Sequence, residues 1–274
     1  MLLAFYQPIQ HEATSMPAIH YQTHSDDINK PWVVLIHGLF GSLDNLSGLR
    51  RLFTDNFQVL SVDLPDHGKS DVSDEFSFDH CALLLEQTLD KLGIDKVTLI
   101  GHSLGGKVAM QLALNHPERV ERLVVIDIAP VKYPARPDQV FTGLNAVDLP
   151  SLTNRKQAET ILSQHIVEGG IRQFLLKSLY NQDEQWNWRF NLKLLQRDYH
   201  KVSAAIESQT SYKGPVLFIK GQLSDYLLAE HRDATQTLFP HSQSKIMSGV
   251  GHWLHAEKPQ LCHKMILSFI LAHS

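Results

Sequence analysis

Apolar residues along this chain gather in short runs, separated by stretches in which they recur every three or four positions. Mostly apolar runs with the length of strands covered on both faces lie at 32–36, which is continuous, and at 58–63, 96–100, 122–127 and 215–220. Helical spacing is clearest over 78–93, where Gly93 is placed to end the helix. This alternation predicts an α/β fold, doubly wound around a mostly parallel sheet.

Weaker patterns predict the remaining elements of this architecture. Strand-like pieces fall at 2–6, 18–23 and 243–247, and helix-like pieces at 45–54, 108–114, 229–239 and 259–272.

The alternation of strand-like and helix-like patterns stops after Pro130. Prolines punctuate 130–150, and helical patterns then dominate from 154 to 210 without strand alternation. We therefore expect an α/β core made of residues 1–130 and 213–274, with residues 131–212 inserted as a helical cap or lid. The aromatic residues of the insertion are expected either to line a pocket or to pack the cap onto the sheet; they are Phe174, Tyr180, Trp186, Trp188, Phe190 and Tyr199.

Composition narrows the class of protein. With 274 residues, 43% hydrophobic and 20% charged, the chain suits one large domain, and disordered and membrane-spanning classes are disfavoured. A net charge of −4 without a dense Lys/Arg run argues against nucleic acid as a partner. The apolar start at 1–6 lacks a basic flank and a cleavage site, so no signal peptide is expected. Cys81 and Cys262 fall in helical patterns as buried thiols, which favours a cytoplasmic protein.

The most informative stretch lies between the strand predicted at 96–100 and the helix predicted at 108–114. It reads Gly101-His102-Ser103-Leu104-Gly105, and a Gly-x-Ser-x-Gly turn from strand to helix is the setting of a nucleophile elbow. Such a turn strains the serine backbone and lifts Oγ above the sheet. A Cβ at Gly101 or Gly105 would collide with the opposite arm of the turn. The helix beyond aims free N–H groups at negative charge forming there. The alternative is a glycine-containing loop with a surface serine.

The same stretch overlaps a partial phosphate-binding motif. Residues 101–107 read Gly-x-x-x-x-Gly-Lys, but Val108 stands where that motif needs Ser or Thr to hold magnesium. Lys107 is therefore predicted to face solvent or to pair locally on its helix. His252 and His255 are three residues apart, yet no carboxylate or cysteine set joins them at ligand spacing. We expect neither a metal nor a cofactor.

A serine nucleophile needs a base to take its proton and a carboxylate to orient that base. His252 lies in a Gly-His-Trp stretch before the last predicted helix, which suits a base that follows its nucleophile in the chain. Two aspartates at strand ends compete for the role of the acid. Asp225 follows the strand at 215–220, and Asp127 ends the strand at 122–127. Spacing alone favours Asp225, and the other aspartate would then fix loops by accepting backbone N–H bonds.

An oxyanion hole needs two preorganised N–H donors. Leu104 follows the nucleophile, and Leu39 lies in the loop that leaves the strand at 32–36. These two amides are the predicted donors. Asp66 and His67, in the loop after 58–63, are predicted to be structural and to brace neighbouring loops.

Taken together, these motifs resemble the α/β-hydrolase superfamily over nearly the whole chain. More narrowly, the chain resembles the bacterial YbfF-type esterases, which are related to the mitochondrial abhydrolase-domain-11 proteins. The stretches that carry this resemblance are 37–45, 101–107, 127–131, 173–178 and 251–259.

The resemblance implies hydrolysis of carboxylic esters or acyl-thioesters, acyl-CoA included, without a cofactor. It also implies that Asp127 is the acid. Because this chain carries aspartate at both Asp127 and Asp225, the assignment stays open. The loop at 63–68 departs from the commoner Asp-x-Arg-x-His-Gly, so any role of that arginine does not carry over.

The leading hypothesis is a serine hydrolase that forms an acyl-enzyme on Ser103 and cleaves a small-molecule ester or thioester. C–C bond hydrolases and cofactor-free haloperoxidases of the same fold use similar triads and are the alternatives. A non-catalytic receptor or scaffold is a third. Haloalkane dehalogenases and epoxide hydrolases are disfavoured because they place aspartate where Ser103 stands. The physiological substrate, its acyl length and the choice between monomer and dimer stay open.

Overall fold

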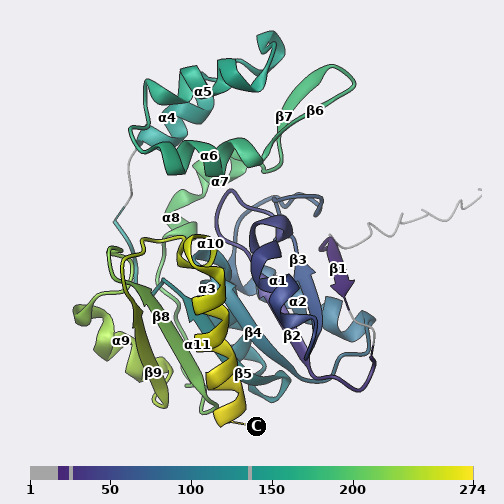
Figure 1. The fold of residues 1–274 in the computed structure, drawn as a ribbon, viewed down its shortest axis with the longest axis vertical. Helices are drawn as coiled ribbons and strands as arrows, with labels where there is room; N and C mark the ends of the chain where they lie inside the picture. Colours follow the sequence, from purple (N-terminus) through teal and green to yellow (C-terminus); the bar gives the residue numbers. More distant parts are fainter. Residues whose placement is uncertain (1–17, 25–26, 135–137, 274) are drawn as a thin grey trace, which may run out of the picture.

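A computed structural model describes residues 18–24, 27–134 and 138–273; the strand predicted at 2–6 lies outside these ranges. A seven-stranded sheet runs through the molecule in the order β1-β3-β2-β4-β5-β8-β9 (Figure 1). Neighbouring strands are parallel except for β1 and β3, which confirms the predicted doubly wound α/β fold. The strands are β1 (Tyr21–His24), β2 (Trp32–Ile36), β3 (Gln58–Val62), β4 (Val97–His102), β5 (Val120–Ile126), β8 (Val216–Gly221) and β9 (Ser242–Met247).

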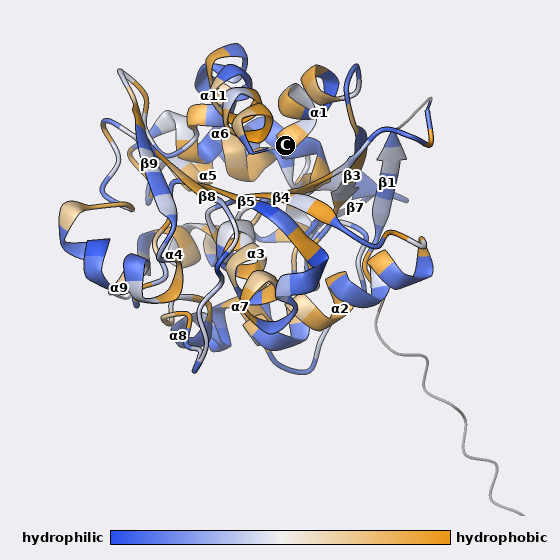
Figure 2. Ribbon diagram, turned by 90° about the horizontal axis from the view of Figure 1, so that it is seen from below, coloured by the Kyte–Doolittle hydropathy of each residue, from blue (hydrophilic) through white to orange (hydrophobic). Residues whose placement is uncertain are grey.

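Helices cover both faces of this sheet. They are η1 (Leu43–Leu46), α1 (Ser47–Phe53), α2 (Phe78–Lys91), α3 (Leu104–Asn115), η2 (Pro117–Arg119), η4 (Ala229–His231), α9 (Arg232–Leu238), α10 (Leu254–Glu257) and α11 (Pro259–Ala272). Helices α1 and α11 pack together on one face, whereas α2 and α3 pack together on the other (Figure 2). Among the helices within the described ranges, none is both long and apolar enough to cross a bilayer.

The double cover explains the apolar runs in the sequence. Residues 33–36 of β2 are all 0% exposed. Val33 and Leu35 pack on the side of α1 and α11, whereas Val34 and Ile36 pack on the side of α2 and α3. Because both faces of the sheet are covered, the odd and the even positions of β2 are both apolar. Each such side chain contributes about 1.5–3 kcal/mol through burial.

Helix α2 begins and ends where its sequence signals predict. The Ser77 side chain accepts a hydrogen bond from the His80 amide at the first turn. Gly93 has a φ of 65°, and its amide donates to the Asp90 carbonyl to close the last turn. Cys81 on α2 and Cys262 on α11 are buried free thiols, as predicted.

Between β5 and β8 the chain forms a separate layer above the carboxyl ends of the strands (Figure 1). We call residues 138–202 the cap. Its elements are α4 (Asp138–Ala146), η3 (Leu149–Ser151), α5 (Arg155–Ser163), α6 (Gly169–Lys177), β6 (Leu179–Gln182), β7 (Gln185–Trp188), α7 (Leu192–Arg197) and α8 (Tyr199–Val202).

The cap contains a hairpin that the sequence did not predict. Strands β6 and β7 pair antiparallel, so the expectation that strands are absent from 154–210 was wrong, although helices do dominate there. The strands are joined by Asp183 and Glu184, whose φ angles are 51° and 64°. Two positive φ angles in a two-residue loop define a type I′ turn, which Asn and Gly usually form. Because neither residue is present, the sequence carries no turn signal there.

Polar contacts join the cap to the core beneath it. The buried Asp198 carboxylate accepts a hydrogen bond of 2.8 Å from the Phe76 amide and a second of 2.8 Å from Arg197 Nε. These bonds, that of Arg197 first, hold the pKa of Asp198 well below its usual range. Ser178 Oγ donates to the Phe40 carbonyl at 2.7 Å. The cap is therefore fixed through specific donors and acceptors as well as through apolar packing.

Replacing Asp198 with alanine leaves the buried Phe76 amide without its acceptor. We expect Asp198→Ala to lower the free energy of unfolding by about 2–3 kcal/mol, because bonds to a charged acceptor are worth about that much. The matched control is Glu75→Ala, which removes a carboxylate that pairs with Lys201 and is 69% exposed; it should cost clearly less than Asp198→Ala, because exposed ion pairs contribute little to stability. Chemical denaturation of both variants measures the difference, and equal losses would contradict the role given to Asp198.

Candidate active site

Ser103 occupies the single position between β4 and α3. Its φ of 52° and ψ of −118° lie in a region that residues with a Cβ rarely enter. The Ser103 amide donates to the Ile126 carbonyl on β5 at 3.0 Å, which holds the turn against the sheet. The structure therefore has the sharp strand-to-helix turn predicted for this stretch, with its strain located at the serine.

Two glycines make room for the turn. A Cβ on Gly101 would strike the backbone of Gly105, and a Cβ on Gly105 would strike the Ile36 and His37 carbonyls. The predicted collision with the opposite arm of the turn is confirmed for Gly101, whereas a Cβ on Gly105 would collide with the end of β2 instead. Any side chain at either position would force α3 away from the strands.

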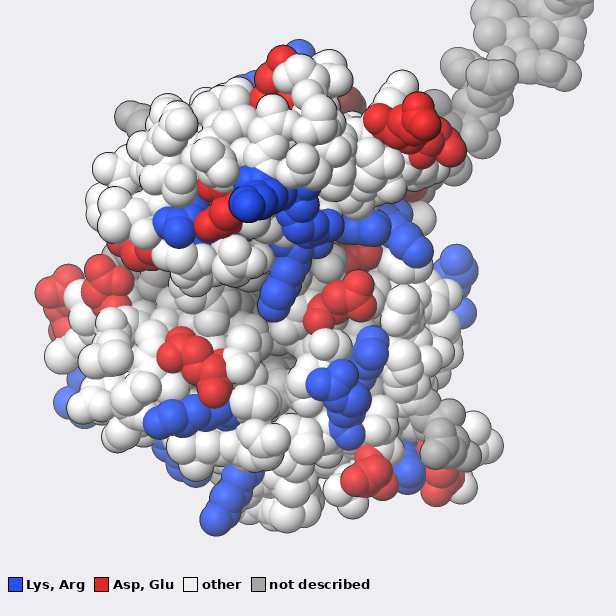
Figure 3. Space-filling model, turned by 45° about the horizontal axis from the view of Figure 1, so that its top comes forward, with Lys and Arg blue, Asp and Glu red and all other residues white. Residues whose placement is uncertain are grey.

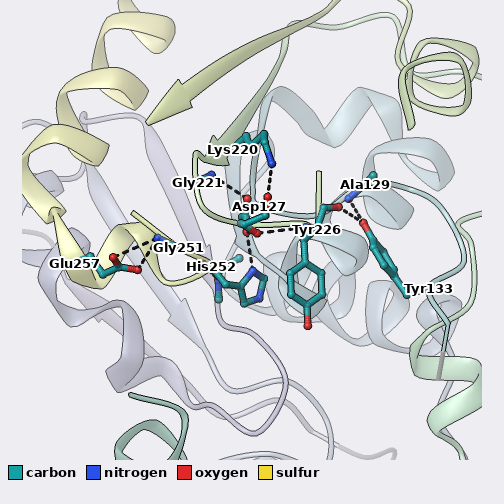
Figure 4. Close-up of polar contacts among 11 residues, drawn as sticks. Asp127, Ala129, Tyr133, Lys220, Gly221, Tyr226, Gly251, His252 and Glu257 are labelled. Atoms are coloured by element: carbon teal, nitrogen blue, oxygen red, sulfur yellow. Dashed lines mark hydrogen bonds and ion pairs between the residues drawn. The ribbon is translucent and has the colours of Figure 1, made fainter. Parts of the chain in front are cut away.

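The His252 ring approaches a buried carboxylate. His252 Nδ1 lies 2.8 Å from Asp127 Oδ2 (Figure 4). Asp127 is 0% exposed. Its other partners are the Gly221 amide, which donates to Oδ1 at 2.9 Å, and Ser224 Oγ, which donates to Oδ2. These donors satisfy the oxygens of a carboxylate that has no access to water.

Asp225, the other candidate for the acid, lies nearer the surface. It is exposed, in the loop that follows β8, and it borders the cavity that Ser103 also lines. The structure thus brings Asp127 to His252 Nδ1 and leaves Asp225 at the rim.

A tyrosine pair connects the loops that carry these groups. The Tyr226 ring stacks on the His252 ring with centroids 4.0 Å apart and planes inclined by 24°. Tyr133 Oη donates to the Tyr226 carbonyl and accepts from the Ala129 amide at 2.8 Å (Figure 4). The residues after β5 and those after β8 are therefore joined at the side of the histidine.

His102 supports His252 from the other side. Its Nε2–H donates to the His252 carbonyl at 2.9 Å, and its ring centroid lies 4.7 Å from that of His252 and 4.3 Å from that of His255. Burial lowers the pKa of His102 well below its usual value and that of His255 to about 3. Both rings are therefore neutral near pH 7.

The two residues predicted to supply the oxyanion hole, Leu39 and Leu104, both belong to the wall of one cavity. Among hydrogen bonds between described residues, none takes up either amide. The next amide along, that of Phe40, instead donates to His67 Nε2 at 3.2 Å.

Two neutral histidines hold the loop that carries Leu39. His37 Nε2 accepts from the Leu64 amide at 3.0 Å, while His67 Nδ1–H donates to the Pro65 carbonyl at 2.9 Å. Burial lowers the pKa of each to about 4. Asp66 accepts from the Asn191 side chain of the cap at 2.9 Å. Asp66 and His67 brace neighbouring loops, as the sequence predicted.

A cavity of about 570 Å³ lies between the core and the cap. The space-filling surface is hollowed between these two parts, and side chains of both charges stand around the hollow (Figure 3). Ser103, His252 and both predicted amides reach it from the core. About half of its apolar wall comes from the cap: Val140, Phe141, Ile166, Ile171, Phe174, Leu175, Tyr199 and Val202.

Only part of the expectation for the cap aromatics applies to this cavity. Phe174 and Tyr199 line it. Trp188 and Phe190 are buried elsewhere and stack with centroids 5.4 Å apart. Phe190 also packs against Phe40 of the core at 4.9 Å, so this pair joins the cap to the core.

Lys107 does not face solvent, and that alternative of the prediction was wrong. It is 2% exposed, because α3 is buried from Leu104 to Leu114 between the sheet, α2 and the segments leading to the cap. Its ammonium donates to the carbonyls of Val131 at 2.9 Å and of Ala204. A lysine on a helix covered on all sides must find such acceptors.

Comparison with known proteins identifies the family of this chain. The chain is 39% identical to Esterase YbfF of Escherichia coli (strain K12) over 253 residues, which cover 92% of this chain and 98% of that protein. This chain is an α/β hydrolase of the YbfF type. The family profile described as alpha/beta hydrolase fold matches residues 31–166.

Two further relatives place this hydrolase among esterases and lipases by name. It is 36% identical to the protein named sn-1-specific diacylglycerol lipase ABHD11 of Mus musculus, over 92% of this chain and 85% of that protein. A solved structure titled Marine microorganism esterase superposes with a TM-score of 0.89 at 30% identity, covering 93% of this chain and all of that one.

Sequence reasoning missed several residues around the site. His102 and Lys107 lie inside the motif that pointed to Ser103, but nothing local shows that they are buried. Tyr133, Ser224 and Tyr226 reach the site through contacts with segments about a hundred residues away. No periodicity or spacing in the sequence signals such contacts.

The buried histidines predict how stability depends on pH. A histidine whose pKa is lowered on folding stays neutral in the folded chain while the unfolded chain takes up a proton. The stability it contributes is complete above the unfolded pKa of about 6.5 and is lost as the pH falls toward the folded pKa, which is about 3 for His255. We expect the free energy of unfolding to fall between pH 6.5 and pH 4.

Removing one of the buried histidine rings should make the free energy of unfolding depend less on pH. His255→Leu should reduce the slope between pH 6 and pH 5 by about 1 kcal/mol per pH unit. Denaturation at several pH values measures it. The control is the exposed His241→Leu, which should leave the slope unchanged; equal slopes in all three proteins would contradict the burial argument.

Proposed function

We propose that this protein hydrolyses carboxylic esters through an acyl-enzyme on Ser103. The observation that carries the proposal is the 2.8 Å contact between His252 and the buried Asp127 carboxylate, at the wall of the cavity that Ser103 lines. The names of the relatives, esterase and diacylglycerol lipase, support a carboxylic ester as the substrate. Thioesters, acyl-CoA among them, react through the same tetrahedral chemistry and belong to the proposal.

In the proposed mechanism, Ser103 Oγ attacks the acyl carbon while His252 Nε2 takes its proton. Asp127 holds the proton on His252 Nδ1, so that Nε2 is free to act as a base. The Leu39 and Leu104 amides stabilise the oxyanion of the tetrahedral intermediate. His252 then gives its proton to the leaving alcohol or thiol. A water molecule, activated by the same histidine, attacks the acyl-enzyme and releases the acid.

We further propose that the insertion predicted at 131–212, which contains the cap, covers the site and that the apolar wall of the cap receives the acyl chain. Phe141, Ile171 and Phe174 are apolar, so an aliphatic acyl group that displaces water from them would bind favourably. The groups proposed for bond cleavage all come from the core. Chain-length preference should therefore depend on the cap, and bond cleavage on the core.

The choice of acid can be tested directly. Asp127→Asn should slow fluorophosphonate labelling of Ser103 by about 10³- to 10⁴-fold, because the amide favours the wrong tautomer of His252. Asp225→Asn should stay within about threefold of the wild type, because an exposed rim carboxylate does not orient the base. Mass spectrometry of peptides locates the adduct and times its formation. Slow labelling in Asp225→Asn alone would assign the role to Asp225, and an adduct elsewhere than Ser103 would refute the mechanism.

The nucleophile and the base should act as one unit. Ser103→Ala and His252→Ala should each abolish nearly all ester hydrolysis, and the double variant should be less active by no more than about threefold than either alone. Turnover of a p-nitrophenyl ester by the three variants measures this. Losses that multiply would mean that the two residues act independently.

A further inference from the structure

Lys107 lies one helical turn beyond Ser103 on α3, about 6 Å along the helix axis. Its side chain is buried, and among the side chains that the structure describes no carboxylate pairs with it. A buried ammonium without a counter-charge is costly. Its presence needs a reason beyond the stability of α3.

The two acceptors of Lys107 belong to the two segments that lead into and out of the cap. Nζ donates to the Val131 carbonyl, five residues beyond the end of β5, and to the Ala204 carbonyl, just after α8. We call residues 130–134 and 203–206 the stalk. Its two segments are also bonded to each other, because the Tyr133 amide donates to the Ser203 carbonyl at 2.9 Å and the Ile206 amide donates to the Pro130 carbonyl at 3.1 Å. The Lys107 side chain thus ties both segments of the stalk to α3, the helix that follows Ser103.

The same ammonium also contacts Tyr133, one member of the tyrosine pair beside His252. Nζ lies 4.9 Å from the centre of the Tyr133 ring and 5.6 Å from that of Phe78. Tyr133 bonds to the Tyr226 carbonyl, and Tyr226 stacks on His252. A continuous series of contacts therefore links Lys107, through Tyr133 and Tyr226, to His252.

Lys107 borders the cavity as well. Together with Tyr133, Val202 and Ser203 it forms the wall on the side of the stalk. The position of this wall depends on the bonds that Lys107 makes, because the two carbonyls have no other tie to α3 among the hydrogen bonds of the described residues.

We propose that Lys107 is a positioning residue that fastens both segments of the stalk to the nucleophile helix and thereby sets the acyl-chain selectivity of the cavity. The selectivity role rests on the proposed function. The fastening role does not require a charged lysine. Burial lowers the pKa of Lys107 to about 7, and the neutral amine keeps two N–H groups, enough for both carbonyls.

Lys107→Met tests the proposal, because methionine keeps most of the length and apolar stem and loses every donor. The substrates are p-nitrophenyl acetate, whose acyl group ends near Ser103, and p-nitrophenyl octanoate, whose chain reaches along the cavity. We expect KM for the octanoate to rise about 3- to 30-fold, and any change for the acetate to be clearly smaller. Lys30→Met is the control: Lys30 also donates to a carbonyl, that of Thr54 at 3.4 Å, but precedes β2 at the opposite end of the sheet. It should change neither ester.

Hydrogen exchange of the stalk gives a readout that does not depend on activity. The Tyr133 and Ile206 amides should exchange at least about tenfold faster in Lys107→Met, while α3 amides keep their protection. Unchanged exchange would overturn the fastening role, as would faster exchange throughout α3. Equal losses on both esters, or none, would overturn the selectivity role. A wild-type protein that hydrolyses neither ester and does not label at Ser103 would refute the proposed function and the selectivity role with it, and exchange alone would then decide the fastening role.

Discussion

The contact between the start of α3 and the ends of β2 and β4 is the constraint on which this structure depends. Backbone meets backbone there, with Gly101 and Gly105 at the two points where a methyl group would not fit. Because the helix is held so close to the sheet, the residue that joins them must turn within one position. Ser103 takes that position with a strained φ of 52°, and the first amides of α3 point to the same place. The strain of the serine and the position of the amide donors therefore have one cause.

The order of the strands brings the remaining groups to this place. Strands β4, β5 and β8 are neighbours, so the residues that leave their carboxyl ends meet above the sheet. Asp127 leaves β5 with a φ of 55°, which turns its carboxylate toward the loop that follows β8. A carboxylate buried to that degree is costly unless donors surround it. The Gly221 amide, Ser224 and His252 are those donors, so the bonds that fix the carboxylate also fix the histidine.

Much of the fold could be predicted from the sequence because it follows from local rules. Strands buried on both faces appear as apolar runs, and Gly93 ends its helix through a conformation that glycine adopts easily. The motif around Ser103 fixed both the turn and the steric need for its glycines. Features set by distant partners were missed. Lys107 reads as a surface residue on its own helix, yet its acceptors lie 24 and 97 residues away. The cap hairpin was missed because Asp183 and Glu184 form a turn that usually carries Asn or Gly.

The cap and the core contribute different kinds of interaction to the cavity. The core supplies a strained serine, a buried carboxylate and amides whose positions are fixed by strand order and backbone packing. Much of the cavity wall from the cap is made of side chains such as Ile171 and Phe174, which can change in size without disturbing those groups. The cap is joined to the core through polar contacts at Asp198 and Ser178, and Lys107 holds the stalk that leads to the cap. Because Lys107 lies on α3, its bonds to the stalk couple the shape of the cavity to the helix that follows Ser103.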